Sequence, residues 1–106
     1  MQIIVKGHQV EVTPALRDYA TSKFERVTRF WDQLHEINVV LGLEKVMHKA
    51  EVNMQLSGKA LHAEAVATDM YAAIDTLVDK VEMQLRKHKG KQTDHRAETV
   101  RAARYG

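Results

Sequence analysis

The stretch DMYAAIDTLVDKVEMQLRKHKGK, residues 69–91, carries the most regular pattern in the chain and decides how the rest of it packs. On a helix, at about 100° per residue, its apolar residues form one stripe with the i, i+3, i+4, i+7 spacing of a helix docked on a core. The stripe consists of Ile74, Leu77, Val78, Val81 and Leu85. We therefore expect an amphipathic helix packed on a second structural layer.

The charges of this helix are sorted by sign onto its two flanks. The acidic flank holds Asp75, Asp79 and Glu82. The basic flank holds Lys80, Gln84, Lys87 and Lys91 at i, i+4, i+7, i+11. Opposite-sign i, i+4 pairs would stabilise a helix by about 0.2–0.5 kcal/mol each, and sorting the charges forgoes part of that. The pattern favours a partner that is itself an extended array of negative charge.

The N-terminal segment predicts a strand followed by a helix. In residues 1–12, Ile3 and Val5 share one face, and Gly7 ends or bulges the strand. Thr13-Pro14 is a strong helix start, because threonine caps the first turn and proline needs no N–H partner there. The predicted helix runs from Pro14 to about Asp32. Its expected buried stripe is Leu16, Ala20, Phe24, Val27, Trp31 and, at the end, Leu34.

From residue 36 to residue 67 the apolar period becomes two, which predicts three half-buried strands. The inward residues are Ile37, Val39, Leu41 and Leu43 in the first of these strands, Ala50, Val52, Met54 and Leu56 in the second, and Leu61, Ala63, Ala65 and Ala67 in the third. Short breaks at Glu44-Lys45 and Ser57-Gly58-Lys59 predict hairpins, hence an antiparallel meander. Thr68 or Asp69 then caps the second helix.

The order β-α-β-β-β-α predicts an α+β fold: a four-stranded mixed sheet with both helices on one face, like the double-stranded-RNA-binding domain. The helical crossover makes the first strand parallel to the second. The other face of the sheet should be exposed to solvent. Its predicted residues are Lys49, Glu51, Asn53, Gln55, His62 and Glu64. In the first helix Lys23, Arg26 and Arg29 line one flank, and we expect them to join the basic row of the second helix in one basic groove or ridge.

The chain has 106 residues, which predicts one domain. We expect an α/β domain over residues 1–91 and a basic, disordered tail over residues 92–106, with Arg96, Arg101 and Arg104. No apolar run approaches the roughly 18–20 residues of a membrane span, and no signal peptide is present, so we expect a cytoplasmic protein without a membrane partner. Zero cysteines exclude disulfides and thiolate chemistry.

The net charge of +2 is unevenly divided along the chain. Residues 1–79 hold 8 Lys+Arg and 11 Asp+Glu, whereas residues 80–106 hold 8 Lys+Arg and 3 Asp+Glu. Such asymmetry points to nucleic acid or an anionic membrane, or else to a solvated lysine-rich terminus. Charge alone leaves these alternatives open.

No catalytic constellation is recognisable. The six histidines are scattered, the five glycines are isolated, and Asp75 and Asp79 lie on an exposed flank without a base, nucleophile or pocket. We therefore predict no enzyme activity, no metal and no cofactor. Trp31 is read as a core anchor at the helix end, with base stacking as the alternative. The remaining features, a rigid domain with basic helical flanks, favour binding of structured RNA through its phosphates rather than its base edges.

Two motifs carry a family resemblance. The first is I-x-V-x-G-x-x-x-x-V-T-P-A-L-R-D-Y over residues 3–19, and the second is D-M-Y-A-A-I-D followed by D-K-V-E-x-Q-L-x-K-x-K over residues 69–89. Together they resemble the bacterial ribosome hibernation promoting factor family, whose sibling is YfiA. The resemblance implies a protein that occupies the mRNA and tRNA decoding channel of the small ribosomal subunit, contacts ribosomal RNA, and blocks translation in stationary phase.

The resemblance also implies the RNA-binding residues, on the two helices. They are Lys23, Arg26, Arg29, Lys80, Arg86, Lys87, Lys89 and Lys91. Asp69, Met70 and Tyr71 belong to the signature and are read first as cap and packing. Met83 departs from the family pattern, which often has a basic residue there, so the second row is expected to be weaker, with Arg86 compensating.

The length resembles the short form of the family, which acts with a separate ribosome modulation factor to favour dimerised, inactive ribosomes. We expect a monomer away from the ribosome. The basic tail favours this promoting role over that of the YfiA sibling, whose tail is acidic. The alternative function is a protein-interaction module that modulates a transcription sigma factor, as older family naming suggests.

Overall fold

The computed structural model describes residues 2–29, 31, 34–56 and 58–93, with side chains described through Lys87. The elements are β1 (Gln2–Gly7), α1 (Pro14–Thr28), β2 (Leu34–Glu44), β3 (Met47–Leu56), β4 (Lys59–Ala67) and α2 (Met70–Thr93). This is the predicted β-α-β-β-β-α order. Among the described residues, no helix is long and apolar enough to cross a membrane.

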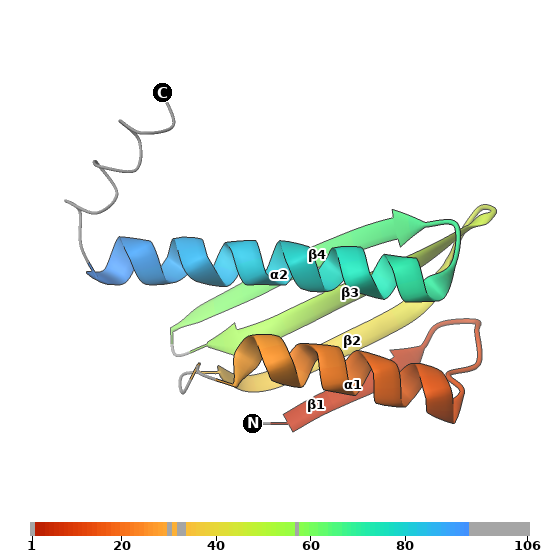
Figure 1. Ribbon diagram of the computed structural model, residues 1–106, viewed down its shortest axis with the longest axis horizontal. Coiled ribbons are helices and arrows are strands. Elements are labelled where there is room, and N and C mark those ends of the chain that lie inside the picture. The colour runs from red at the N-terminus through yellow and green to blue at the C-terminus, as the bar shows by residue number, and fades with distance from the viewer. Residues whose placement is uncertain (1, 30, 32–33, 57, 94–106) are drawn as a thin grey trace.

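The four strands form one mixed sheet in the order β1-β2-β3-β4. β1 pairs parallel to β2, while β2–β3 and β3–β4 are antiparallel, as the crossover and the two short breaks predict. Both helices cover the same face of the sheet, with α1 on the side of β1 and β2 and α2 on the side of β3 and β4 (Figure 1). The fold prediction is confirmed.

Helix α1 begins where predicted and ends earlier. Thr13 Oγ1 accepts a hydrogen bond from the Leu16 N–H at 3.2 Å, and Pro14 occupies the first turn. At the other end the Thr28 hydroxyl donates to the Phe24 carbonyl at 2.6 Å, a competing bond typical of β-branched Thr at a bent or ending helix. The predicted end near Asp32 is therefore wrong, and Leu34 belongs to β2 instead.

Helix α2 is capped by Asp69, one of the two predicted candidates. Its Oδ1 accepts from the Ala72 N–H at 2.9 Å, and its carbonyl accepts from the Ala73 N–H at 3.1 Å. These bonds satisfy amide groups that have no partner within the helix. The helix continues to Thr93, two residues beyond Lys91.

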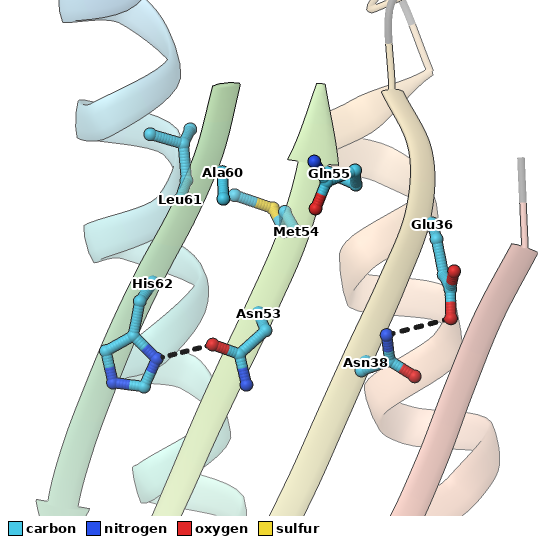
Figure 2. A pocket seen from close by; sticks show the side chains of 8 residues that line it. All are labelled: Glu36, Asn38, Asn53, Met54, Gln55, Ala60, Leu61 and His62. Atoms are coloured by element: carbon cyan, nitrogen blue, oxygen red, sulfur yellow. Dashed lines mark hydrogen bonds between the residues drawn. The ribbon is translucent and has the colours of Figure 1, made fainter. Parts of the chain in front are cut away.

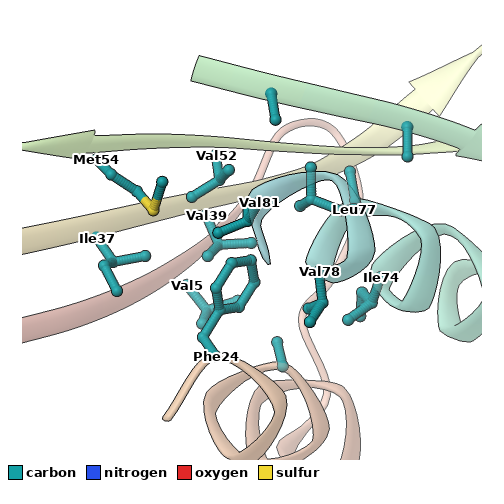
Figure 3. Close-up of a cluster of buried hydrophobic side chains, with 14 of the residues drawn as sticks. Val5, Phe24, Ile37, Val39, Val52, Met54, Ile74, Leu77, Val78 and Val81 are labelled. Carbon is teal, nitrogen blue, oxygen red and sulfur yellow. The ribbon is translucent and has the colours of Figure 1, made fainter. Parts of the chain in front are cut away.

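The core lies between the sheet and the two helices. Phe24 of α1 points at the sheet beside Val5, Val39 and Val81 (Figure 3), and it is fully buried. The α2 stripe is buried as predicted, and so are most inward strand residues. These buried strand residues are Ile37, Val39, Leu41, Ala50, Val52, Met54, Leu56, Ala63 and Ala65. Leu61 and Ala67 are half-buried against this core.

Leu43 was expected in the core, and that prediction is wrong: its side chain is 54% exposed. It keeps the alternation of β2, but the β2–β3 hairpin extends past the N-terminal end of α2, where no helix covers the sheet (Figure 1). Alternation determines which face a side chain is on, but not whether another element covers that face.

Candidate nucleic-acid interface

Helix α1 and the residue that caps its C-terminal end, Arg29, carry three of the predicted RNA-binding residues. Arg26 and Arg29 are exposed, whereas Lys23 is half-buried. Lys23 Nζ lies 3.4 Å from Asp75 Oδ1 of α2 and 5.4 Å from the centre of the Tyr19 ring. The Lys23 charge is therefore engaged between the two helices, while the side chains of Arg26 and Arg29 are more exposed to solvent.

The acidic flank of α2 faces α1. A groove of about 250 Å³ separates the two helices and contains charges of both signs. Its lining residues are Lys23, Arg26, Val27, Val78, Asp79 and Glu82. Two cations from α1 thus lie opposite two carboxylates from α2, with apolar side chains at the floor.

The basic flank of α2 faces β4. Lys80 Nζ donates to the Glu64 carbonyl at 2.7 Å, and Gln84 Nε2 donates to the His62 carbonyl at 3.0 Å. The acidic flank of α2 therefore lies between this row and α1, and the prediction that the two basic rows join in one groove is wrong. Which flank of a helix faces its neighbour depends on the helix direction and on the hand of the packing, and neither follows from the spacing of charges.

The C-terminal half of α2 carries the remaining candidates. Arg86 Nη2 lies 3.1 Å from Glu82 Oε2 one turn earlier, on the α1 side of the helix. Lys87 is exposed, and no ion pair or hydrogen bond links it to the described residues. Met83, the departure from the family pattern, is 60% exposed. Lys89 and Lys91 lie on the helical backbone, but their side chains, like residues 94–106 of the predicted tail, are outside the described part of the chain.

A tyrosine joins the two helices next to Lys23. The Tyr19 hydroxyl donates to Asp75 Oδ1 at 2.6 Å, and its ring packs edge-to-face on Tyr71 with centroids 4.8 Å apart. The pKa of Tyr19 is raised from its ordinary value of 10.0, first by the hydrogen bond to Asp75, then by partial burial and by the negative charge of Asp75. Lys23 opposes the shift. The network holds the groove walls in a fixed relation.

The opposite face of the sheet is open, as predicted. It has a shallow hollow of about 290 Å³ near the end of β3 (Figure 2). Four of its polar side chains are bonded in pairs: Asn53 Oδ1 lies 2.8 Å from His62 Nδ1, and Asn38 Nδ2 donates to Glu36 Oε2 at 3.0 Å. This face presents a mixed polar surface rather than a row of cations.

Among the residues that the structure describes, Glu51, His62 and Glu64 form the one group whose ligand atoms are close enough to hold a metal ion, within 4.8 Å of one another. Lys49 Nζ lies 3.8 Å from Glu64 and 3.3 Å from Glu44, and these carboxylates raise the pKa of Lys49, Glu44 foremost through its hydrogen bond. A cation for Glu64 is thus already supplied by the protein.

Residues 3–93 match the family described as Sigma 54 modulation protein / S30EA ribosomal protein. The chain belongs to this family. The resemblance inferred from the two terminal motifs is thereby confirmed. A relative in Klebsiella oxytoca, named ribosome hibernation promoting factor, is 46% identical over 95 residues, which are 90% of this chain and 100% of the relative.

Solved structures of similar proteins have the same fold as this member of the S30EA family. A ribosomal subunit interface protein from Coxiella burnetii superposes with a TM-score of 0.80 at 32% identity, covering 84% of this chain and 98% of that one. The N-terminal domain of Thermus thermophilus Protein Y superposes with a TM-score of 0.74 at 36% identity, covering 83% and 99%.

Two contacts of this S30EA-family chain were missed by reading the sequence. Tyr19 and Asp75 are 56 residues apart, and nothing local relates them. Arg17 Nη1 donates to the Val5 carbonyl at 2.9 Å and so fixes α1 to β1. The resemblance includes these positions in its two motifs, but their pairing appears only once the helices are packed together.

Proposed function

We propose that this protein binds the small ribosomal subunit, blocks the channel used by mRNA and tRNA, and keeps ribosomes inactive in stationary phase. The observation that carries the proposal is the match, over the full length of the relative, to a ribosome hibernation promoting factor at 46% identity. The name of the Coxiella burnetii neighbour, a ribosomal subunit interface protein, points the same way. The protein would then act in the cytoplasm, as a binding protein rather than an enzyme.

The contact would be made mainly with ribosomal RNA. Lysine and arginine side chains bind phosphates irrespective of base sequence, and A-form RNA offers phosphates and 2′-hydroxyls more readily than base edges. The exposed cations of the helical layer suit this mode because they project from rigid elements. Arg26 extends from α1, Arg29 extends from the C-cap of α1, and Lys87 extends from α2.

The predicted residues would not contribute equally. Lys23, Lys80 and Arg86 each have a contact within the protein, to Asp75, to the Glu64 carbonyl and to Glu82. Using them on RNA requires giving up that contact, which reduces the net gain in binding free energy. We therefore assign the larger share to Arg26 and Lys87, which are exposed and which no hydrogen bond or ion pair joins to the described part of the protein. Arg29, Lys89 and Lys91 stay predicted RNA-binding residues.

Promotion of ribosome dimers, in concert with a separate ribosome modulation factor, is part of the proposal. A domain of this size fits within one ribosomal subunit, so joining two ribosomes would require another protein or a change in the ribosome itself. The residue 92–106 segment, with its three arginines, would add a further phosphate contact.

Sigma-factor modulation is the second candidate, and the family description itself favours it. A protein partner would use the open sheet face, whose mixed polar surface includes the carboxylates of Glu36, Glu51 and Glu64. Binding through that face would be insensitive to changes at Arg26 or Lys87.

Sedimentation on sucrose gradients tests the two candidates. The protein should sediment with small subunits at low salt and stay at the top of the gradient at high salt. Binding to phosphates releases counterions, so a higher salt concentration weakens it. Arg26→Glu and Lys87→Glu should each weaken binding by roughly tenfold. Lys6→Glu makes the same charge change on the open face and is the matched control. If only Lys6→Glu weakens binding, the protein contacts ribosomal RNA through the open sheet face and not through the helices. If the protein remains at the top of the gradient at both salt concentrations, it does not bind the small subunit and the proposal fails.

A further inference from the structure

β4 is an edge strand of the sheet, paired on one side with β3 only. An edge strand presents unpaired backbone N–H and C=O groups that another strand can bind. β4 is nine residues long, which is ample for such pairing. Natural proteins commonly block such edges with charged side chains or with a covering element.

Two side chains of α2 occupy the β4 edge. Lys80 donates to the Glu64 carbonyl and Gln84 donates to the His62 carbonyl, at 2.7 Å and 3.0 Å. Alternate residues of an edge strand turn their backbone groups away from the sheet, and His62 and Glu64 have this two-residue spacing. They are thus the carbonyls that an incoming strand would use.

The two spacings match because of the regular geometry of helix and strand. Lys80 and Gln84 are four residues apart on a helix, a rise of about 6 Å, while His62 and Glu64 are two residues apart on a strand, about 6.8 Å. The numbering runs in opposite directions, so α2 lies antiparallel to β4. The pairing of Lys80 with Glu64 and of Gln84 with His62 follows directly from that arrangement.

We propose that the β4 edge is a strand-pairing surface that Lys80 and Gln84 hold closed, and that the partner it would otherwise bind is a second copy of this chain. An antiparallel β4–β4 pair centred on Ala63 places His62 of each copy opposite Glu64 of the other. Ala60 then lies opposite Val66, and Lys59 opposite Ala67, so no like charges face each other. The edge is therefore complementary to itself, and α2 keeps the protein monomeric.

The double variant Lys80→Ala/Gln84→Ala tests this device by removing both donors while keeping residues that favour the helix. Sedimentation velocity over a range of concentrations should give a single-chain mass for the wild-type protein and a mass that doubles with concentration for the variant. Lys87→Ala/Met83→Ala is the matched control on the same helix, since neither side chain donates a hydrogen bond to β4 in the described part of the chain, and it should remain monomeric.

Glu64→Pro, added to the double variant, identifies the surface. Proline at position 64 removes a backbone N–H that points away from the sheet. The monomer does not need this N–H for its own strand pairing, but a β4–β4 pair does, so the triple variant should return to the monomer. Circular dichroism checks that each variant is folded. A folded double variant that stays monomeric at every concentration overturns the proposal. So does a wild-type protein that dimerises equally well, or a dimer that persists after Glu64→Pro.

Discussion

The Tyr19 hydroxyl lies 2.6 Å from Asp75 Oδ1, and this hydrogen bond connects the middle of α1 to the first turns of α2. Lys23 Nζ approaches the same carboxylate oxygen at 3.4 Å. One acidic side chain of α2 therefore holds both a phenol and an ammonium group of α1. The acidic flank of α2 therefore has a structural role that needs no partner molecule. Part of it holds α1 and α2 at a fixed angle and distance from each other.

The first prediction concerns the titration of Tyr19. Its pKa is raised from 10.0, chiefly by the hydrogen bond to Asp75, so the fold favours the neutral phenol. The contribution to stability is complete below the ordinary pKa and is lost as the pH rises through the raised value. Asp75→Asn should bring the pKa back down. Phenolate absorbance, measured in a Tyr71→Phe/Tyr105→Phe background, checks this, and an unchanged pKa in Asp75→Asn would contradict it.

The second prediction concerns the cap of α2. Asp69→Ala should lower the free energy of unfolding by about 1 kcal/mol, because the Ala72 N–H loses its acceptor. Thr68→Ala is the matched control, since Thr68 lies one position earlier and is exposed. Urea unfolding followed by circular dichroism measures both variants. Equal losses would show that the cap is not at Asp69.

The third prediction compares two leucines of β2 that share one face of the strand. Leu41 is fully buried and Leu43 is 54% exposed. Leu41→Ala should cost about 2–5 kcal/mol, whereas Leu43→Ala should cost less than about 1 kcal/mol. The two changes remove the same atoms, so the difference in unfolding free energy reports how differently the two side chains are buried. A large loss for Leu43→Ala would mean that the hairpin tip is covered in solution.

The fold could be predicted from the sequence because each element has a clear period and clear ends. The alternation of Val39 and Leu41, and of Val52 and Met54, fixes the strands, and Thr13-Pro14 fixes the start of α1. The ends were less certain where a side chain competes with the helix, as Thr28 does through its hydroxyl. The prediction that Leu43 is buried was wrong, because whether a helix covers a strand residue depends on the whole fold.

The RNA-binding residues of the candidate interface stay a prediction, and their arrangement on the surface did not follow from the sequence. Helical spacing correctly groups Lys80 with Gln84, and these two do project together, but onto β4. Spacing cannot show that the acidic flank of α2 turns toward Lys23 and Arg26. The orientation of a helix about its axis fixes that relation, and the neighbouring elements fix the orientation.

The last prediction separates two lysines of α2 that the sequence places in one row. If Lys87 contacts a phosphate, Lys87→Ala should weaken binding to the small subunit and reduce the slope of log affinity against log salt by about one. Lys80 donates to the Glu64 carbonyl, so Lys80→Ala should change that slope less. The two variants have the same net charge, which removes any effect of long-range attraction from the comparison. Binding measured at several salt concentrations gives both slopes, and equal slopes would mean that Lys80 leaves β4 to bind RNA.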